Sequence, residues 1–180
     1  IIEDYAILHL STHATPGDFY TPPAIEFYNE TLYLPEIYGY NLDYNLVVLS
    51  ACETGIGTLR KGEGVLSLAR GFSYAGVKNL IVSLWKVNDK STENLMAGFY
   101  KNYKKTGSKS EALHTSKLTY LEDTSIPALK KSPYYWASFI YFGEVTPIAE
   151  QNNMYWWILI VFIALLVSFI FLKNSRFGLN

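Results

Sequence analysis

Short apolar runs alternate with longer segments of helical periodicity along the first 144 residues. Strands are predicted at the four apolar runs Tyr5–Leu10, Leu46–Leu49, Val77–Leu84 and Tyr134–Phe142. Leu46–Leu49 consists of four large apolar residues, two of them β-branched, which is typical of a strand buried on both faces.

Three segments between these strands carry apolar residues three and four positions apart, and this spacing predicts helices. They are Glu63–Tyr74, Ser91–Lys104 and Ser108–Tyr120. Ser108 is a candidate N-cap, because Glu111 follows it at the spacing of a capping box. Strands that alternate with helices favour βαβ crossovers, so the predicted fold class is α/β, with a mainly parallel sheet flanked by helices.

Smaller elements are predicted between the first two strands. Ser11–Asp18 is expected to be a loop because it contains a Pro-Gly-Asp turn signal. Ala24–Leu34 is expected to form a small hairpin, and Pro35–Asn41 a single helical turn.

The C-terminal part of the chain has a different pattern. Met154–Leu172 contains nineteen residues without a charge, and about 20 apolar residues in a helix span a bilayer. The sequence therefore predicts a transmembrane helix in contact with the lipid bilayer, a buried core helix being the alternative. The domain prediction is a globular domain over residues 1–144, a linker at Val145–Asn153, this helix, and a short basic tail at Lys173–Asn180.

The charges that flank Met154–Leu172 suggest an orientation in the membrane. Lys173 and Arg176 lie on its C-terminal side, whereas the nearest charge on the other side is Glu150. The positive-inside rule therefore places the tail in the cytoplasm and the globular domain outside it.

Composition narrows the function only slightly. The 180 residues are 49% hydrophobic, which suffices for a sizeable core, and the formal net charge of −1 gives no basic surface that would indicate nucleic-acid binding. No cofactor is predicted. The chain begins without a methionine and in a strand-like segment, so we expect it to be part of a longer protein.

The single cysteine is the first candidate for chemistry. Cys52 follows the buried strand after Ser50 and Ala51, at the edge where open α/β sheets place their ligands, and Gly55 and Gly57 come after it. The alternative is that Cys52 is a small buried hydrophobe. A catalytic cysteine needs a base to supply its thiolate. If the first two strands are parallel neighbours, His13 reaches the same edge as Cys52.

The other histidines suit chemistry less well. His9 falls inside the first strand and is expected to be a hydrogen-bonded core histidine, and His114 is expected on a helix surface. A metal site built from His9, His13 and Cys52 is an alternative, since zinc accepts such ligands. The spacing suits a helix better than a strand and a loop, so no metal site is predicted.

Several motifs occur together and in order: LHLSTHA, LVVLSACETGIG, GEGVLSLARGFSYAGVKNLIVSLWKVND and SPYYWASFIYFGE. In this combination the chain resembles the CHAT domain, a caspase-like peptidase family related to separases, gingipains and caspases. The resemblance covers Tyr5–Glu144. It implies a caspase-like sheet whose N-terminal part precedes Ile1, and tetratricopeptide repeats upstream that would bind a regulator.

The resemblance also implies roles for individual residues. It makes Cys52 the nucleophile and His13 the acid/base, with the backbone amides of Cys52 and Ala14 as oxyanion donors. The family usually has glycine at the position of Ala14, where a positive φ would be strained for alanine. Similarity to separases makes Asp89, after the Trp85 turn, a candidate receptor for a basic residue of the substrate.

Two side chains in this assignment have other interpretations. Asp89 is equally well placed as the N-cap of the following helix, and Glu53 either adds a negative field beside Cys52 or faces solvent. The sequence thus favours a membrane-anchored cysteine endopeptidase that cuts protein substrates after a basic residue. The alternative is a CHAT-fold interaction module without activity, for which Ala14 is the main indication.

Overall fold

The computed structural model describes residues 6–18, 20–50, 54–55, 57–60, 64–86, 88–145 and 160–164. The chain divides into two units, Ile1–Thr146 and Pro147–Asn180. The first unit contains every strand of the described residues and is the one that carries the candidate site.

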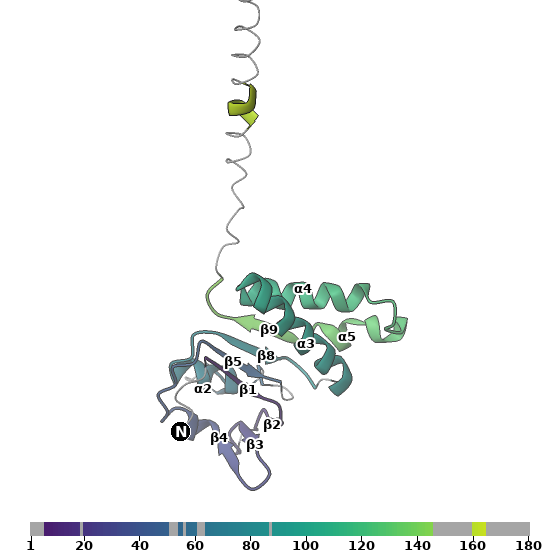
Figure 1. Cartoon of the computed structure of the whole chain (residues 1–180). Coiled ribbons are helices and arrows are strands. Elements are labelled where there is room, and N and C mark those ends of the chain that lie inside the picture. The colour runs from purple at the N-terminus through teal and green to yellow at the C-terminus, as the bar shows by residue number, and fades with distance from the viewer. Residues whose placement is uncertain are drawn as a thin grey trace, which may run out of the picture. The chain divides into compact units, whose positions relative to one another are not determined.

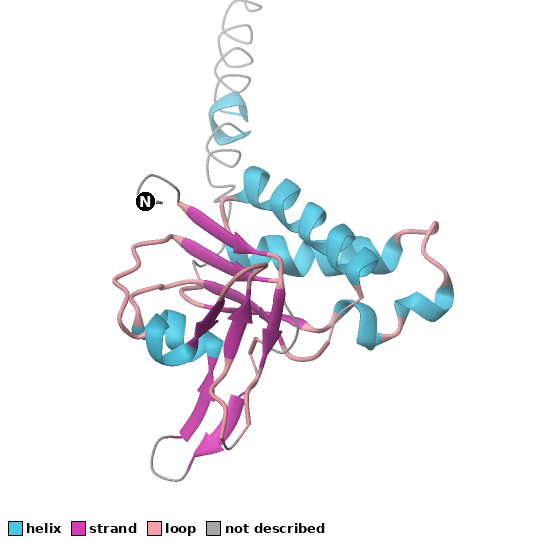
Figure 2. Ribbon diagram, turned by 90° about the horizontal axis from the view of Figure 1, so that it is seen from below, coloured by secondary structure: helices cyan, strands magenta, loops and turns pink. Residues whose placement is uncertain are grey.

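A four-stranded main sheet forms the centre of the first unit (Figures 1 and 2). Its order is β1 (Ile7–Leu10), β5 (Leu46–Leu49), β8 (Leu80–Ser83) and β9 (Phe139–Phe142). The first three strands are parallel, and β9 pairs antiparallel to β8. The predicted α/β class with a mainly parallel sheet is confirmed.

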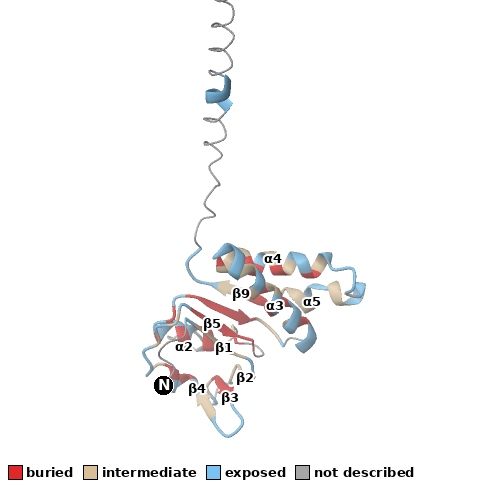
Figure 3. Ribbon diagram, viewed as in Figure 1, coloured by how far each residue is buried: buried red, intermediate tan, exposed pale blue. Residues whose placement is uncertain are grey.

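The two central strands are buried on both faces, as Figure 3 shows in red. Because successive side chains of a strand point to opposite faces, β5 contributes to two separate cores. Val47 and Leu49 pack with Phe72 on one face, whereas Val48 packs with Phe99 on the other. This double burial explains why a continuous apolar run, rather than an alternating one, marks the strand in the sequence.

Helices cover both faces of the main sheet (Figure 1). The first face carries α1 (Leu34–Ile37) and α2 (Leu68–Tyr74), and the second carries α3 (Asp89–Thr106) and α4 (Lys109–Glu122). Ser108 caps α4 by accepting a hydrogen bond from the Glu111 amide at 3.4 Å, so the predicted cap is confirmed. Helices α3 and α4 pack closely because Gly98 lies against Ser116, where a β-carbon would come within 2.6 Å of Oγ.

A second, three-stranded antiparallel sheet follows β1. It consists of β2 (His13–Thr15), β3 (Ala24–Glu26) and β4 (Thr31–Tyr33), in the order β2-β3-β4. The predicted hairpin over Ala24–Leu34 is confirmed as β3 and β4. The loop predicted over Ser11–Asp18 is wrong at its centre, because His13–Thr15 pairs with β3, a partner that lies beyond the turn.

The helix predicted over Glu63–Tyr74 begins later than expected. Gly64–Ser67 is strand β7, which pairs antiparallel with β6 (Gly57–Arg60), and α2 starts at Leu68. Ser67 ends the strand and caps the helix by accepting a hydrogen bond from the Arg70 amide at 3.3 Å. Pairing with the preceding strand in a hairpin thus takes precedence over the helical spacing of Val65 and Leu66.

The strand predicted over Tyr134–Phe142 is likewise shorter. Its first part is a helical turn, α5 (Pro133–Trp136), preceded by a 3₁₀ turn, η1 (Ala128–Lys131). Pro133 occupies the first helical position, where its fixed φ favours a helix. The Trp136 indole donates to the Lys131 carbonyl at 3.1 Å, which holds this turn. Aromatic content alone therefore overestimated the strand.

The predicted transmembrane segment Met154–Leu172 lies largely outside the described residues. Residues 160–164 are helical, and all five are exposed. Among the described residues, none of the helices has the length and apolar character that crossing a membrane requires.

Candidate functional site

Strands β1 and β5 end together at one edge of the main sheet, here called the carboxyl edge. Leu10 and Leu49, their last residues, are in register. The Ser50 amide continues the pairing by donating to the Leu10 carbonyl at 3.0 Å. The chain therefore leaves this edge at two neighbouring residues. Leu10 lies three residues before His13, and Ser50 lies two residues before Cys52.

Cys52 and Glu53 lie outside the described residues, but both ends of their loop are described. Thr54, fully buried, donates from Oγ1 to the Leu49 carbonyl at 3.2 Å and accepts from the Ser83 amide at 3.0 Å. The Gly55 amide donates to the Ser83 carbonyl at 2.8 Å. The loop that contains Cys52 thus begins and ends on the carboxyl edge, with its exit held between β5 and β8.

His13 is the first residue of β2, and its side chain is exposed. Its partner in the register of β2 and β3 is Glu26, which is exposed as well. Opposite residues of an antiparallel pair have β-carbons about 5 Å apart and project from the same face. A carboxylate thus lies on the same face as the candidate base, a relation that no sequence spacing indicated.

Ala14 lies in the middle of β2, opposite Ile25. A strand is an extended conformation that alanine adopts without strain. The glycine usual at this position is therefore not required by the backbone of β2. Whether the Ala14 amide acts as an oxyanion donor stays a prediction.

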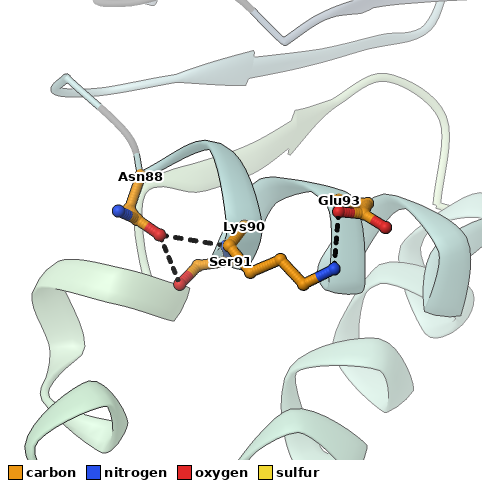
Figure 4. A network of polar contacts seen from close by, with 4 residues as sticks. All are labelled: Asn88, Lys90, Ser91 and Glu93. Carbon is orange, nitrogen blue, oxygen red and sulfur yellow. Dashed lines mark hydrogen bonds and ion pairs between the residues drawn. The ribbon is translucent and has the colours of Figure 1, made fainter.

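Asp89 is the first residue of α3 and is exposed. Asn88 caps this helix, because its Oδ1 accepts hydrogen bonds from the amide and hydroxyl of Ser91, and Lys90 pairs with Glu93 at 2.8 Å (Figure 4). The interpretation of Asp89 as the N-cap is wrong. The carboxylate of Asp89 remains exposed beside a fixed helix terminus.

The turn before α3 is held from a second direction. The Trp85 indole donates to the Tyr134 carbonyl of α5 at 2.9 Å, and the Leu84 amide donates to the Ser138 carbonyl at 2.9 Å. The tryptophan therefore ties the segment that leads to Asp89 to the residues just before β9.

His9 is bonded through both ring nitrogens, although the residue is exposed. Nε2 lies 2.7 Å from Ser50 Oγ, and Nδ1 lies 2.9 Å from the Tyr100 hydroxyl of α3. Burial against these neighbours lowers the pKa of His9. The predicted hydrogen bonding of His9 is confirmed, but its predicted place in the core is wrong, because the residue is exposed.

These bonds bear on the metal alternative. The nitrogens of His9 are engaged with Ser50 and Tyr100, and the side chain of His13 projects from a different sheet. Within the described ranges, no three His, Cys, Asp or Glu side chains are grouped as a metal site would require. His114 is exposed on α4, as predicted.

The chain was compared with known protein families and with curated proteins. A family model of the CHAT domain matches residues 1–144. No curated protein matches the chain. The matched family is linked to cysteine peptidases and has a caspase-like fold, in agreement with the mainly parallel sheet and the helices on its two faces.

Proposed function

The chain belongs to the CHAT domain family, and from this membership and the carboxyl edge we propose that it is a cysteine endopeptidase with a Cys52–His13 dyad. The observation that carries the proposal is the register of β1 and β5. Leu10 and Leu49 end side by side, so the segments that lead to His13 and to Cys52 start from neighbouring points. Three residues of chain span at most about 11 Å, and this short reach supports the pairing of the two residues in one site.

The proposed reaction proceeds through an acyl-enzyme. The Cys52 thiolate attacks the carbonyl carbon of the scissile peptide bond, and the negative charge moves to the carbonyl oxygen, which the amides of Cys52 and Ala14 stabilise. The His13 imidazolium then gives its proton to the leaving amine as the C–N bond breaks. Water attacks the resulting thioester while His13 accepts a proton of the water, and the C–S bond then breaks, which releases the acid product and restores the Cys52 thiolate.

The exposure of His13 supports a large substrate. An acid/base residue that acts on a polypeptide must be reachable from solvent, and His13 lies at the start of an edge strand of the small sheet. A protein substrate would therefore approach along β2.

The charge distribution supports a basic residue at the cleaved position. Residues 1–59 contain eight Asp or Glu and neither Lys nor Arg. Among them, Glu26 and Glu30 are exposed on β3 and in the turn after it. These carboxylates, with those of Asp89 and Glu53 in the proposed site, would attract a cationic segment of the substrate.

Cleavage of arginine- and lysine-containing peptides by the full chain tests the dyad. Cys52→Ala and Cys52→Ser are expected to abolish cleavage while the far-UV circular dichroism spectrum stays unchanged. A Cys52→Ala variant that cuts as fast as the parent would overturn the proposal. Absence of cleavage by the parent on a broad peptide library would favour the interaction module instead.

The role of Asp89 is tested on the same substrates. Asp89→Ala is expected to reduce the preference for arginine over neutral residues by about tenfold, the loss typical of one charge-assisted contact. Glu122→Ala, an exposed carboxylate near the end of α4, is the matched control and should leave the preference unchanged. An unaltered preference in Asp89→Ala would assign substrate recognition to other carboxylates.

We further propose that Met154–Leu172 anchors the domain in a membrane, with the catalytic unit on the side opposite the basic tail. The support is the uncharged sequence and the helical, exposed residues 160–164. The single cysteine provides the test. In intact cells that express the full chain, a membrane-impermeant maleimide should label Cys52 before lysis. Labelling only after lysis would reverse the orientation, and recovery of the chain in the soluble fraction would exclude the anchor.

A further inference from the structure

Three side chains from three segments meet beside the loop that contains Cys52. His9 comes from β1, Ser50 follows β5, and Tyr100 comes from the middle of α3. Their bonds are His9 Nε2 to Ser50 Oγ at 2.7 Å and His9 Nδ1 to the Tyr100 hydroxyl at 2.9 Å. Ser50 Oγ also lies 3.4 Å from the Leu10 carbonyl, to which it donates. These residues are called the His9 network.

One arrangement of hydrogens satisfies every group of the His9 network. The Tyr100 hydroxyl donates to Nδ1, Nε2–H donates to Ser50 Oγ, and the Ser50 hydroxyl donates to the Leu10 carbonyl. This arrangement requires a neutral imidazole, in agreement with the pKa of His9, which burial lowers. The chain of bonds therefore runs in one direction, from α3 to the end of β1.

Ser50 connects the His9 network to the entry of the loop that contains Cys52. Ser50 is only 8% exposed and is the last described residue before Cys52. Thr54 holds the exit of the loop by its bonds to β5 and β8, whereas the entry is held by the Ser50 amide and by the His9 network. Among the described strands β1 pairs only with β5. The hydroxyl of Tyr100 bonds His9 of β1 to helix α3.

We propose that His9, Ser50 and Tyr100 are positioning residues that hold the entry of the nucleophile loop, and with it the distance between Cys52 and His13. This inference rests on the proposed dyad. A thiolate is stabilised by a nearby imidazolium only at close range, and small displacements of catalytic groups have large effects on reactivity. The network would thus act on the reactivity of Cys52 by setting its distance from His13.

The single cysteine allows a test that needs no substrate. Iodoacetamide alkylates only Cys52, so the rate of alkylation as a function of pH gives the pKa of that thiol. Tyr100→Phe removes one hydroxyl and keeps the ring that packs on His9. It is expected to raise the pKa of Cys52 and to slow alkylation at pH about 6.5 by about fivefold.

Two further variants complete the comparison. Ser50→Ala removes the other end of the network and should have the same effect on alkylation. Tyr103→Phe is the matched control, because Tyr103 lies on the same helix one turn later and no hydrogen bond of its hydroxyl is present in the described part of the chain. Its alkylation profile should equal that of the parent, and thermal melts of all variants show whether each is folded.

A double-mutant cycle with His13→Ala separates positioning from a general structural role. In the His13→Ala background, Tyr100→Phe is expected to have no further effect on alkylation. Equal effects in both backgrounds, or no effect of Tyr100→Phe and Ser50→Ala in the parent, would overturn the positioning role while leaving the dyad intact. If His13→Ala itself leaves the profile of Cys52 unchanged, the dyad fails, and the positioning role fails with it.

Discussion

The two edges of the main sheet use similar polar residues in different ways. At the amino edge, where β5 and β8 begin, Asn79 donates from Nδ2 to the Asn45 carbonyl at 2.8 Å and accepts from the Tyr141 hydroxyl at 2.6 Å. These bonds join the ends of three strands to one another. At the carboxyl edge, Thr54 and Ser50 bond the ends of strands to a loop.

The difference separates stability from reactivity. Polar groups that bond the ends of strands to one another contribute to the free energy of unfolding. Polar groups that hold a loop also determine where the loop places its side chains. Substitutions at the amino edge should therefore change stability alone, whereas substitutions at the carboxyl edge should change the reactivity of Cys52 as well.

The largest effect is expected for Thr54→Val at the carboxyl edge. Valine has the shape of threonine but leaves the Leu49 carbonyl and the Ser83 amide without this partner, at a cost of about 3 kcal/mol in the free energy of unfolding. Alkylation of Cys52 should slow by about tenfold or more, because the loop loses its exit contact. Urea denaturation and iodoacetamide kinetics measure the two effects.

Thr119→Val on α4 is the control for this substitution, because Thr119 is exposed. It should leave both the free energy of unfolding and the alkylation rate within error of the parent. A Thr54→Val variant that loses stability but keeps its alkylation rate would show that the loop is positioned without the Thr54 contact.

A smaller effect, confined to stability, is expected for Asn79→Ala at the amino edge. The variant loses the bonds to Asn45 and Tyr141, and the free energy of unfolding should fall by about 2 kcal/mol. The alkylation rate of Cys52 should not change under conditions where the protein is folded. A slower alkylation of the folded variant would mean that the two edges are coupled through the sheet.

The sequence predicted those parts of the fold whose signals are local. The run Leu46–Leu49 and the cap at Ser108 require only neighbouring residues, and both are confirmed. The strand at Gly64–Ser67 depends on pairing with Gly57–Arg60, and the one at His13–Thr15 depends on Ala24–Glu26. These pairings outweigh local periodicity, so a pattern read along the chain misassigned both segments.

The same distinction applies to the candidate site. His13 and Cys52 were predicted as site residues because each follows a recognisable strand and lies in a motif. Tyr100 is 91 positions away from His9, and Glu26 became the partner of His13 only through the register of β2 and β3. Contacts of this kind depend on tertiary packing, and one sequence carries no signal for them.

A weaker effect is expected from the titration of His9, which makes the free energy of unfolding depend on pH. The pKa of His9 is lower in the folded chain than its usual value of 6.5, so the unfolded chain binds more protons between the two values. The contribution of His9 to stability is therefore present above pH 6.5 and is lost as the pH falls below it.

His9→Gln should reduce this loss between pH 7 and pH 5, as measured by urea denaturation at several pH values. Hydrogen bonds from Thr21 and Ser125 lower the pKa values of the Asp18 and Asp123 carboxyls, respectively, from their usual value of 3.8. These two groups therefore change the free energy of unfolding only at pH values below about one unit above 3.8. Their contribution does not overlap the range of His9. An identical pH dependence in parent and His9→Gln would mean that His9 titrates alike in both states.

The smallest effect, and the only stabilising one, is expected for Ser138→Ala at the carboxyl edge. Ser138 is fully buried, and its hydroxyl has no hydrogen-bond partner within the described part of the chain. Removing such a group relieves a desolvation cost, so the free energy of unfolding should rise by about 1 kcal/mol. Ser116→Ala is the matched control, because the equally buried Ser116 hydroxyl donates to the Leu95 carbonyl at 2.6 Å, and its loss should lower stability. If both substitutions lower stability, Ser138 Oγ has a partner in solution, and the carboxyl edge is as well satisfied as the amino edge.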